Sequence, residues 1–331
     1  MLFGGQRPER GFKMTPRRLS LSELRTFRRC RRTWWLGYHQ GFQPKMPEIV
    51  GARSLGNVVH AALEAYYLPG TFRDMSVPLE QVELLRARDL ERLAVEDTFG
   101  DKLKKAHDQY DLARIMVEGY VEWVEETGHD AYLDVLGVEK NLEHVVEARQ
   151  GTPYTLAGRV DHLAQYSNTQ EVIIRDYKTV ANLVDLPKTA SLNEQGLHYY
   201  WLLSKIEPEM QIDSSEFVML RKVKRTAQAK PPFYGSHKTR INRFKLDAWS
   251  RRLWGMVNDV EDAELRLAAG EDPMTVCYPN PLSTCSWDCD HLALCDMLDD
   301  GSRWEGAAAE FYVIGDPYAR YNAIINEKEF E

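Results

Sequence analysis

Hydrophobic and polar positions change their spacing along the chain, and the changes predict helices, then strands, then helices with one more strand between them. Helical spacing places apolar residues on one face of a segment, whereas strand segments are rich in β-branched residues and short enough to lie between turns. The order predicts a mixed α/β or an α+β core. Helices are predicted over 55–67, 79–127 with an interruption near Gly100, 191–205 and 244–268, and strands within 132–180 and over 214–223.

An earlier helix is predicted from a capping motif. Ser20-Leu21-Ser22-Glu23 has the spacing of a capping box, with Ser20 as N-cap and Glu23 returning to its backbone N–H. We expect the helix to run through Phe27, Cys30 and Trp34.

The strand-rich part contains a hairpin. The segments Tyr154–Ala164 and Glu171–Val180 read as strands, and Ser167-Asn168-Thr169-Gln170 reads as the turn between them. A turn centred on Asn168 and Thr169 sets Asp161 directly opposite Asp176.

Lys178 lies two residues beyond Asp176, so a strand places it on the same side of the sheet. Two carboxylates and a lysine then converge, which suits divalent-metal chemistry on a phosphodiester. A solvated surface pair is the alternative for so short a pattern. Val172-Ile173-Ile174 is apolar on both faces, however, so Asp176 and Lys178 end a buried strand, where charges require a reason.

Two further sites have an ordinary interpretation, and the first of them has a functional one as well. Gln195 and Tyr199 share a helix face and can bind a phosphate or stack on a base, or they can be a surface Gln beside a core Tyr. His60 lies among small apolar residues, which is typical of a core histidine.

Four of the five cysteines fall near the C-terminus, in the pattern Cys285-x3-Cys289-x5-Cys295 with Cys277 upstream. The fifth, Cys30, lies between pairs of arginines that favour its thiolate. Such clustering indicates a structural zinc ion or an iron–sulfur cluster, both of which take four cysteines. Cys30 is the expected fourth ligand, with Cys277 as the spare.

A basic segment follows the last predicted strand. Residues 221–245 contain nine Lys or Arg and no acid, with aromatic residues between them, and Pro231-Pro232 argues against regular structure in its middle. A basic loop with aromatics suits single-stranded nucleic acid, since charge follows the backbone and rings stack on bases. The candidate DNA-binding residues are Arg221, Lys222, Lys224, Arg225, Lys230 and Tyr234.

The overall charge is −8, which alone argues against a nucleic-acid partner, but the charge is unevenly distributed. The first 45 residues carry eleven Lys or Arg against two acids, which is compatible with a local phosphate-binding face. There is no apolar run of transmembrane length, no signal-peptide apolar region and no G-x-x-x-x-G-K-[ST] loop. We therefore expect a cytoplasmic protein without membrane contact, and no ATP-driven motor.

Together and in this order, the motifs resemble the RecB-like branch of the PD-(D/E)XK nuclease superfamily. The chain looks closest to iron–sulfur exonucleases of the CRISPR-associated (Cas-four) and AddB nuclease type, often found in bacteriophages, which would place it in a host cytoplasm. The resemblance runs from Ser20 to Cys295. The segments that carry it are Ser20-x-Ser22-x-Leu24-x-x-Phe27-x-x-Cys30, Gly56-x-x-x-His60, Gly158-Arg159-Val160-Asp161, Asp176-Tyr177-Lys178-Thr179, Gln195-x-x-x-Tyr199 and the C-terminal cysteines.

The resemblance implies a role for each position. His60, Asp161 and Asp176, with the Tyr177 carbonyl, would bind Mg²⁺ or Mn²⁺, and Lys178 would orient or deprotonate the attacking water. Gln195 and Tyr199 would position the DNA strand. The four cysteines Cys30, Cys285, Cys289 and Cys295 would hold a [4Fe–4S] cluster. The family usually has two residues between its first two clustered cysteines and this chain has three, which keeps Cys277 and zinc open as alternatives.

The resulting expectation is a restriction-endonuclease-like core with a helical N-terminal region and an iron–sulfur-clamped C-terminal segment. Its function would be metal-dependent exonucleolytic cleavage of single-stranded DNA or DNA ends in replication, recombination or repair, with proteins of those pathways as possible partners. The alternatives are a catalytically silent DNA-binding accessory protein and a zinc-stabilised adaptor. The predicted regions are a basic arm over 1–18, helices over 19–130, the nuclease core over 131–270 and the cysteine segment with an acidic tail over 271–331.

Overall fold

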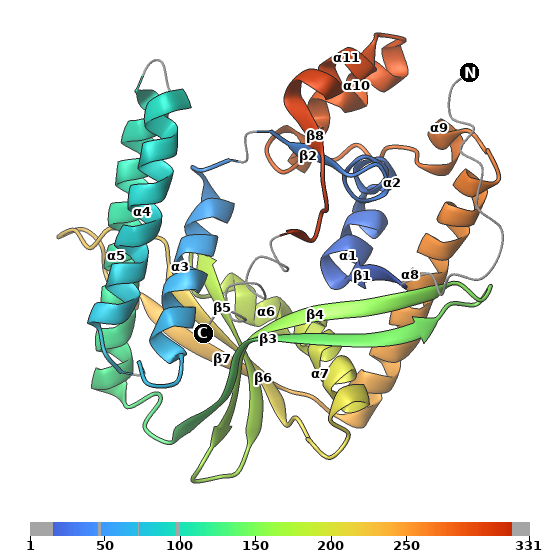
Figure 1. The fold of residues 1–331 in the computed structure, drawn as a ribbon. Helices are drawn as coiled ribbons and strands as arrows, with labels where there is room; N and C mark the ends of the chain where they lie inside the picture. Colours follow the sequence, from blue (N-terminus) through green and yellow to red (C-terminus); the bar gives the residue numbers. More distant parts are fainter. Residues whose placement is uncertain (1–15, 46–47, 72, 97–99, 320–331) are drawn as a thin grey trace.

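A mixed six-stranded sheet forms the centre of the computed structural model, and helices cover both of its faces (Figure 1). The structure describes residues 16–45, 48–71, 73–96 and 100–319. The strands of the sheet are β1 (Arg17–Ser20), β3 (Leu133–Glu147), β4 (Pro153–Tyr166), β5 (Val172–Val180), β6 (Ser214–Arg221) and β7 (Tyr234–Arg240). The predicted mixed α/β core is confirmed.

The helices follow the expected order, with short additions. Those packed around the sheet are α1 (Leu21–Arg29), α2 (Arg31–Trp34), α3 (Ala52–Tyr67), α4 (Ser76–Glu96), α5 (Asp101–Thr127), α6 (Asp185–Thr189), α7 (Glu194–Ile206) and α8 (Arg243–Ala268). The C-terminal part adds α9 (Pro273–Val276), α10 (Leu292–Asp300) and α11 (Trp304–Phe311), and strand β8 (Tyr312–Ile314) pairs with β2 (Phe42–Pro44). Within the described ranges, no helix is long and apolar enough to span a membrane.

One edge of the long strand β4 is shared by two partners. Its first part pairs in parallel with β1 through Tyr154–Ala157, and its last part pairs antiparallel with β5 through His162–Gln165. Between them, residues 158–161 have no strand partner on that edge. The other edge of β4 pairs with β3, and the β3–β4 hairpin extends to the right in Figure 1. The sheet is therefore forked at Asp161.

The register of the β4–β5 hairpin is the predicted one. His162 lies opposite Arg175 and Leu163 opposite Ile174, and the turn covers Ser167, Asn168 and Thr169. Asp161 and Asp176 are one step beyond the last of these pairs, where the two strands separate into the fork.

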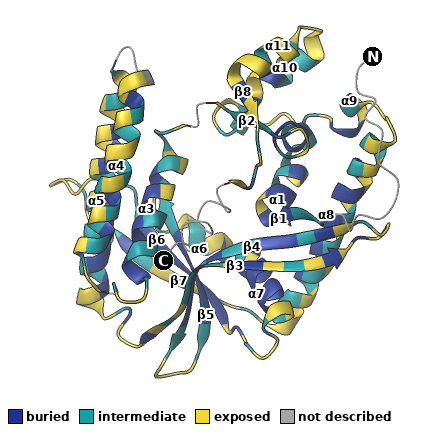
Figure 2. Cartoon of the chain, in the orientation of Figure 1, coloured by how far each residue is buried: buried dark blue, intermediate teal, exposed yellow. Residues whose placement is uncertain are grey.

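Two hydrophobic cores lie on opposite faces of the sheet, and Figure 2 shows the central strands as largely buried. On one face, Val160, Leu163 and Ile174 pack with α1, α7 and α8. On the other face, Ile173 and Tyr177 pack with α3 and α5. Because neighbouring residues of β5 face different cores, Asp176 and Lys178 project on the α7 side and Arg175 and Tyr177 on the α3–α5 side.

The N-terminal helix differs from its prediction in two respects. Ser20 caps α1 as expected, its Oγ accepting from the Glu23 backbone N–H at 3.2 Å. The Glu23 carboxylate does not return to Ser20 but accepts from Trp34 Nε1 at 2.7 Å, inside the core. The helix also stops at Arg29, because Cys30 adopts an extended conformation with φ −159°, and α2 starts after it.

Two expected irregular segments contain strands. Arg17 and Arg18 of the predicted arm belong to β1, while residues 1–15 lie outside the described part of the chain. In the basic segment 221–245, residues 234–240 form strand β7, which pairs antiparallel with β6. The basic loop is therefore limited to residues 222–233. Residues 234–240 read as a loop from the sequence because β7 is an edge strand of the sheet with exposed polar residues at alternate positions.

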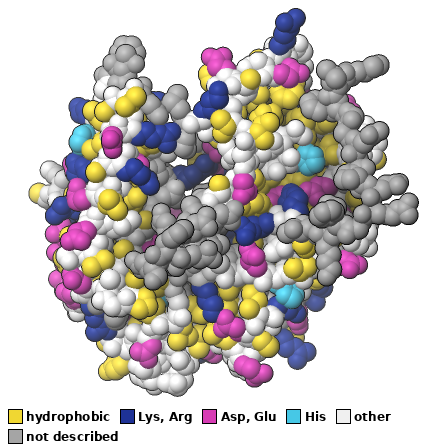
Figure 3. Space-filling view, viewed as in Figure 1, with side chains coloured by type: hydrophobic (Ala, Val, Ile, Leu, Met, Phe, Trp, Pro, Cys, Tyr) yellow, Lys and Arg dark blue, Asp and Glu magenta, His cyan; other side chains and the backbone are white. Residues whose placement is uncertain are grey.

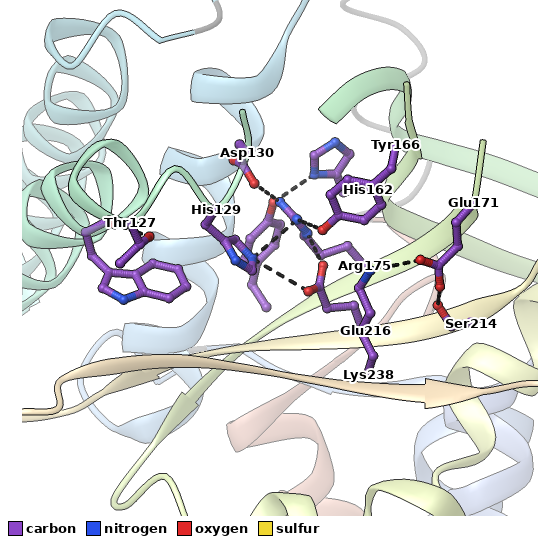
Figure 4. A network of polar contacts seen from close by, with 12 residues as sticks. Thr127, His129, Asp130, His162, Tyr166, Glu171, Arg175, Ser214, Glu216 and Lys238 are labelled. Carbon is purple, nitrogen blue, oxygen red and sulfur yellow. Dashed lines mark hydrogen bonds and ion pairs between the residues drawn. The ribbon is translucent and has the colours of Figure 1, made fainter. Parts of the chain in front are cut away.

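A fully buried ionic network lies behind β5, on the α3–α5 side (Figure 4). Arg175 has no solvent exposure and donates to Glu216 on β6 and to Asp130 beyond α5, each at 2.8 Å. Its other nitrogen donates to Tyr166 at 3.2 Å. Burial by itself raises the pKa of Asp130, but Arg175 outweighs it and holds that pKa below its ordinary 3.8. The Asp130–Arg175 pair therefore stabilises the fold fully at pH values above 3.8, and this contribution is lost as the pH falls through the lowered pKa of Asp130.

Replacement of Arg175 tests how far this network holds the sheet together. Arg175→Met leaves two buried carboxylates without their cation, and we expect it to lower the free energy of unfolding by about 3–5 kcal/mol. Denaturant unfolding followed by circular dichroism measures this loss. The matched control is Lys188→Met, because Lys188 pairs with Asp185 on the surface, where both side chains are exposed. An Arg175→Met protein as stable as the control variant would contradict a structural role for the network.

Candidate functional site

The fork in the sheet brings together the side chains that the sequence singles out. Asp161 comes from β4, Asp176 and Lys178 from β5, and Gln195 from the first turn of α7. His60 reaches the same place from α3, on the other side of the strands. These contributions come from four elements that are distant in sequence, so the site depends on the tertiary fold.

Asp161 occupies an irregular point in β4. Leu156 and Val160 face the α7-side core, whereas His162, also an even-numbered residue, faces the opposite core, where its Nδ1 lies 2.8 Å from the Tyr177 hydroxyl. The alternation of side chains therefore changes phase between Val160 and His162. On the neighbouring strand β3, Glu139 has a positive φ of 47° at the corresponding point. The irregularity allows Asp161 to meet groups from both faces of the sheet.

Asp176, Lys178 and Gln195 form a hydrogen-bonded unit. Lys178 Nζ lies 2.6 Å from Asp176 Oδ2 and donates to Oδ1 at 2.9 Å. Gln195 Nε2 donates to Asp176 Oδ1 at 2.8 Å and to the Tyr199 hydroxyl at 3.0 Å, and its carbonyl accepts from Lys178 at 3.3 Å. The amide of Gln195 thus holds the carboxylate and the ammonium group in fixed positions.

A glycine allows α7 to approach the strands this closely. A Cβ atom at Gly158 would lie 3.0 Å from the Tyr199 ring and 3.1 Å from Leu202. The neighbouring motif residue Arg159 forms an ion pair with Glu139. Gly158-Arg159-Val160-Asp161 therefore combines close helix packing with charge pairing.

The candidate metal ligands differ in part from the prediction. His60 Nδ1 lies 3.2 Å from Asp161 Oδ2, so His60 belongs to the site and is not the ordinary core histidine that its apolar neighbours suggest. The third member of this group is Glu139: ligand atoms of His60, Glu139 and Asp161 all lie within 4.8 Å of one another. Asp176 adjoins the group through Asp161 but is not one of the three. The Tyr177 side chain packs in the α3–α5-side core, where its ring meets that of His60 edge-to-face with 6.3 Å between the centroids and its hydroxyl lies 2.8 Å from His162 Nδ1. Its backbone carbonyl stays a predicted ligand.

Burial and neighbouring charges shift the pKa values of these groups in opposite directions. Burial raises the pKa of Asp176; Lys178 opposes the shift and the charge of Asp161 adds to it, with a net increase. Burial acts likewise on Asp161, but the hydrogen bond and charge of His60 bring its pKa below the ordinary value. Burial lowers the pKa of His60, and Asp161 raises it overall.

The pKa of Glu139 is also raised, chiefly by burial. Burial raises its pKa to about 7, Arg159 opposes this shift, and the charges of Asp161 and Glu64 add to it. A carboxyl group so destabilised as an anion gains most from a nearby cation.

The donor set fits a divalent cation such as Mg²⁺ or Mn²⁺. The two carboxylates are the oxygen ligands that Mg²⁺ and Mn²⁺ take, whereas the imidazole is a ligand type of transition metals and so favours Mn²⁺ over Mg²⁺. Mg²⁺ binds oxygen at about 2.0–2.1 Å, so opposite ligand atoms are about 4.2 Å apart. The separations within 4.8 Å among His60, Glu139 and Asp161 require little adjustment to reach this geometry.

The four candidate cluster cysteines come from both ends of the described chain. Cys30 lies between α1 and α2, Cys285 and Cys289 lie around the turn at Ser283–Ser286, and Cys295 lies on α10. All four are half-buried free thiols, whereas Cys277 has no exposure and belongs to the α7-side core.

Backbone amides donate to two of the thiols, Asn280 N–H to Cys30 at 3.4 Å and Leu282 N–H to Cys285 at 3.3 Å. Burial by itself raises the pKa of Cys30, but hydrogen bonds from Thr33 and Asn280 lower it overall. Burial raises the pKa of Cys295, with the nearby thiols of Cys30 and Cys289 adding to the increase.

The spacing of the thiols bears on the choice of metal. Thiolates bound at 2.3 Å around a tetrahedral zinc ion are about 3.8 Å apart. Among the described residues, no three cysteine sulfurs meet within 4.8 Å. The described thiols are therefore not gathered as closely as the ligands of a bound zinc ion, and the choice between zinc and an iron–sulfur cluster stays a prediction.

The candidate DNA-binding residues are not all available on the surface. Tyr234 is buried against α5 and accepts a hydrogen bond from Arg225, so it cannot stack on a base as expected. Arg225 and Lys224 also pair with Glu122 and Asp108 of α5, at 3.0 and 2.7 Å. These acids lie about a hundred residues upstream, so the absence of acids within the basic segment did not reveal them. Figure 3 shows acidic and basic side chains interspersed over α4 and α5.

A forked mixed sheet with one buried and one half-buried aspartate, a lysine and a histidine defines an α/β protein with a candidate divalent-cation site. The chain belongs to the PD-(D/E)XK nuclease superfamily, whose family model matches residues 18–296. Members of that superfamily are typically metal-dependent nucleases. A search of curated proteins finds no match to the chain. The resemblance is confirmed at the level of the superfamily, and the closer Cas-four or AddB type stays a prediction.

Glu139 is the site residue that sequence reasoning missed. It lies in a run of alternating polar and apolar residues, where one carboxylate resembles its neighbour Glu143. No local motif marks Glu139. Its pairing with Arg159 is set by the β3–β4 register, which joins segments about twenty residues apart.

Comparison of two glutamates on β3 tests the metal group. Glu139→Ala removes one ligand and is expected to weaken Mn²⁺ binding at least about 10–100-fold, measured by titration calorimetry on the intact protein. Glu143→Ala is the matched control, because Glu143 pairs with Arg18 on the surface instead. Equal Mn²⁺ affinity in the two variants would remove Glu139 from the site.

Proposed function

We propose that the protein is a Mg²⁺- or Mn²⁺-dependent deoxyribonuclease that acts as an exonuclease on single-stranded DNA or DNA ends. The observation that carries the proposal is the hydrogen-bonded unit of Asp176, Lys178 and Gln195 beside the group of His60, Glu139 and Asp161. Their roles below rest on this geometry and on membership of the nuclease superfamily.

His60, Glu139 and Asp161, with Asp176 adjoining, would hold the cation. When bound, a divalent cation lowers the pKa of a water molecule and withdraws charge from the scissile phosphate. Asp161 and Asp176 are held in place before substrate arrives, because His60 and Gln195 already orient them.

Lys178 is the proposed group for handling the attacking water. Its ammonium nitrogen donates to both Asp176 and Gln195, and these two hydrogen bonds fix its position. There it orients or deprotonates the water and offsets negative charge on the phosphate in the transition state. Tyr199, bonded to Gln195, would help to place the DNA strand.

We further propose that Cys30, Cys285, Cys289 and Cys295 bind a [4Fe–4S] cluster. Thiol–amide hydrogen bonds from Asn280 and Leu282 support this proposal, because such bonds tune cluster sulfurs. The cluster would fasten the C-terminal segment to the break between α1 and α2. Three cations in or next to loop 222–233 have no acidic partner in the described part of the chain. We propose these three, Arg221, Lys222 and Lys230, as contacts to the DNA backbone.

Substitution of the Asp176–Lys178 pair tests the nuclease proposal. Asp176→Ala and Lys178→Ala are expected to abolish cleavage of end-labelled single- and double-stranded DNA with Mn²⁺ or Mg²⁺, since general-base catalysis alone accounts for about 10²–10⁴ in rate. Lys188→Ala, an exposed lysine paired with Asp185, is the control. DNA binding and the circular dichroism spectrum should be unchanged in all three.

Cleavage at wild-type rate by either variant would exclude the assignment of the pair. A wild-type protein that binds DNA but cleaves none of these substrates would favour the silent accessory protein.

Two cysteine variants test the cluster. Cys30→Ala should remove the broad visible absorption and most of the bound iron, because one ligand is lost. Cys277→Ala, which changes a buried core thiol, should retain both. A colourless wild-type protein that carries zinc would contradict the cluster and support a structural zinc.

A further inference from the structure

A basic groove of about 400 Å³ lies between helices α7 and α8, outside the candidate metal group. Leu192 and Leu197 form its apolar side, and Lys245, Arg251 and Arg252 of α8 form its charged side. Nothing in the function proposed above uses this groove.

Positive charge is in excess around the start of α7. Glu194 is buried and is approached by three guanidinium groups, from Arg28 at 2.9 Å, Arg25 at 3.7 Å and Arg252 at 4.0 Å. One carboxylate cannot neutralise three cations. Lys245 donates to the Arg240 carbonyl at 3.3 Å, and neither it nor the exposed Arg251 has a carboxylate partner in the described part of the chain.

Acids of α5 neutralise part of the positive charge of the basic loop 222–233. Lys224 and Arg225 each have their own acid on α5, so the charge that this loop offers to a phosphate chain is reduced. Lys245 and Arg251 on α8, which lack a carboxylate partner among the described residues, therefore join Arg221, Lys222 and Lys230 as candidate phosphate contacts.

Arg252 links the groove to the start of α7, because it lines the groove and lies 4.0 Å from Glu194. Glu194, at the centre of the cations, directly precedes Gln195, whose amide donates to Asp176. A strand that runs from Asp176 and Lys178 along the first turn of α7 toward α8 would pass Arg252 on its way to Lys245 and Arg251.

Apolar side chains at the same place favour a single strand over a duplex. Phe244 is 81 % exposed and directly precedes the lining residue Lys245 in α8, and Leu192, which lines the groove, is 72 % exposed. An exposed ring beside a row of cations can stack on an unpaired base while the cations follow the backbone.

We propose that the α7–α8 groove binds the single-stranded DNA segment adjoining the nucleotide at the catalytic unit, with Lys245 and Arg251 on phosphates and Phe244 against a base. This inference rests on the proposed nuclease function, because it places the strand relative to Asp176 and Lys178. Binding of DNA in the groove is nevertheless measurable without cleavage.

The test measures binding of a fluorescent oligo-dT over a range of salt concentrations, in the full chain carrying Asp176→Ala so that cleavage does not interfere. Adding Lys245→Ala with Arg251→Ala should weaken binding and reduce the slope of log affinity against log salt by roughly 1.4, since each phosphate contact on a single strand contributes about 0.7. Lys102→Ala with Lys104→Ala, two exposed lysines on α5, removes the same charge elsewhere and should leave the slope unchanged.

Phe244→Ala separates stacking from charge. It should weaken binding roughly fivefold or more without changing the salt slope, as loss of one stacked base does. An unchanged slope in the Lys245–Arg251 variant, or an equal loss in the Lys102–Lys104 control, would overturn the inference. Either result leaves the nuclease proposal intact, because cleavage by the wild type is measured separately.

Discussion

The shared edge of strand β4 is the constraint on which the rest of this structure depends. A strand edge offers one row of backbone hydrogen-bonding groups, and β1 and β5 each take part of it, so the strands must separate between them. The separation lies at Asp161, and β5 carries Asp176 and Lys178 into the opening. Helices α3 and α7, on opposite faces, can then both supply side chains to one place. A sheet with β5 paired along the whole of β4 would have closed this space.

Charged residues are tolerated in this region because each of them has hydrogen-bonding partners on its own side of β5. Arg175 is neutralised by Asp130 and Glu216 behind the strand, while Asp176 meets Lys178 and Gln195 in front. Unpaired, any of these groups would cost several kcal/mol. The two networks are adjacent in sequence but separated by the sheet, and the network behind β5 ties that strand to β6 and to the end of α5.

The surface charges cannot be interpreted from the sequence in the same way as the buried ones. The acid-free segment after β6 reads as the most basic region, yet α5 supplies acids to its loop. The cations around α7 come from α1 and α8, more than two hundred residues apart, and no local window contains them together. Local counts of charge therefore locate cations without locating the electrostatic potential that a nucleic acid meets.

The sequence by itself determined the order of helices and strands, the hairpin register and the convergence of Asp161, Asp176 and Lys178, because strand periodicity is local and the turn fixes the register. Gln195 and His60 became candidates through the family resemblance. Only the tertiary structure brings His60 within 3.2 Å of Asp161 and adds Glu139 to the candidate metal group, since their partners lie on other elements and the phase of β4 changes at Asp161. It also decided that Cys30 ends a helix, that Tyr234 is buried and which cations are neutralised. These features depend on contacts between distant segments, and periodicity along one segment carries no information about them.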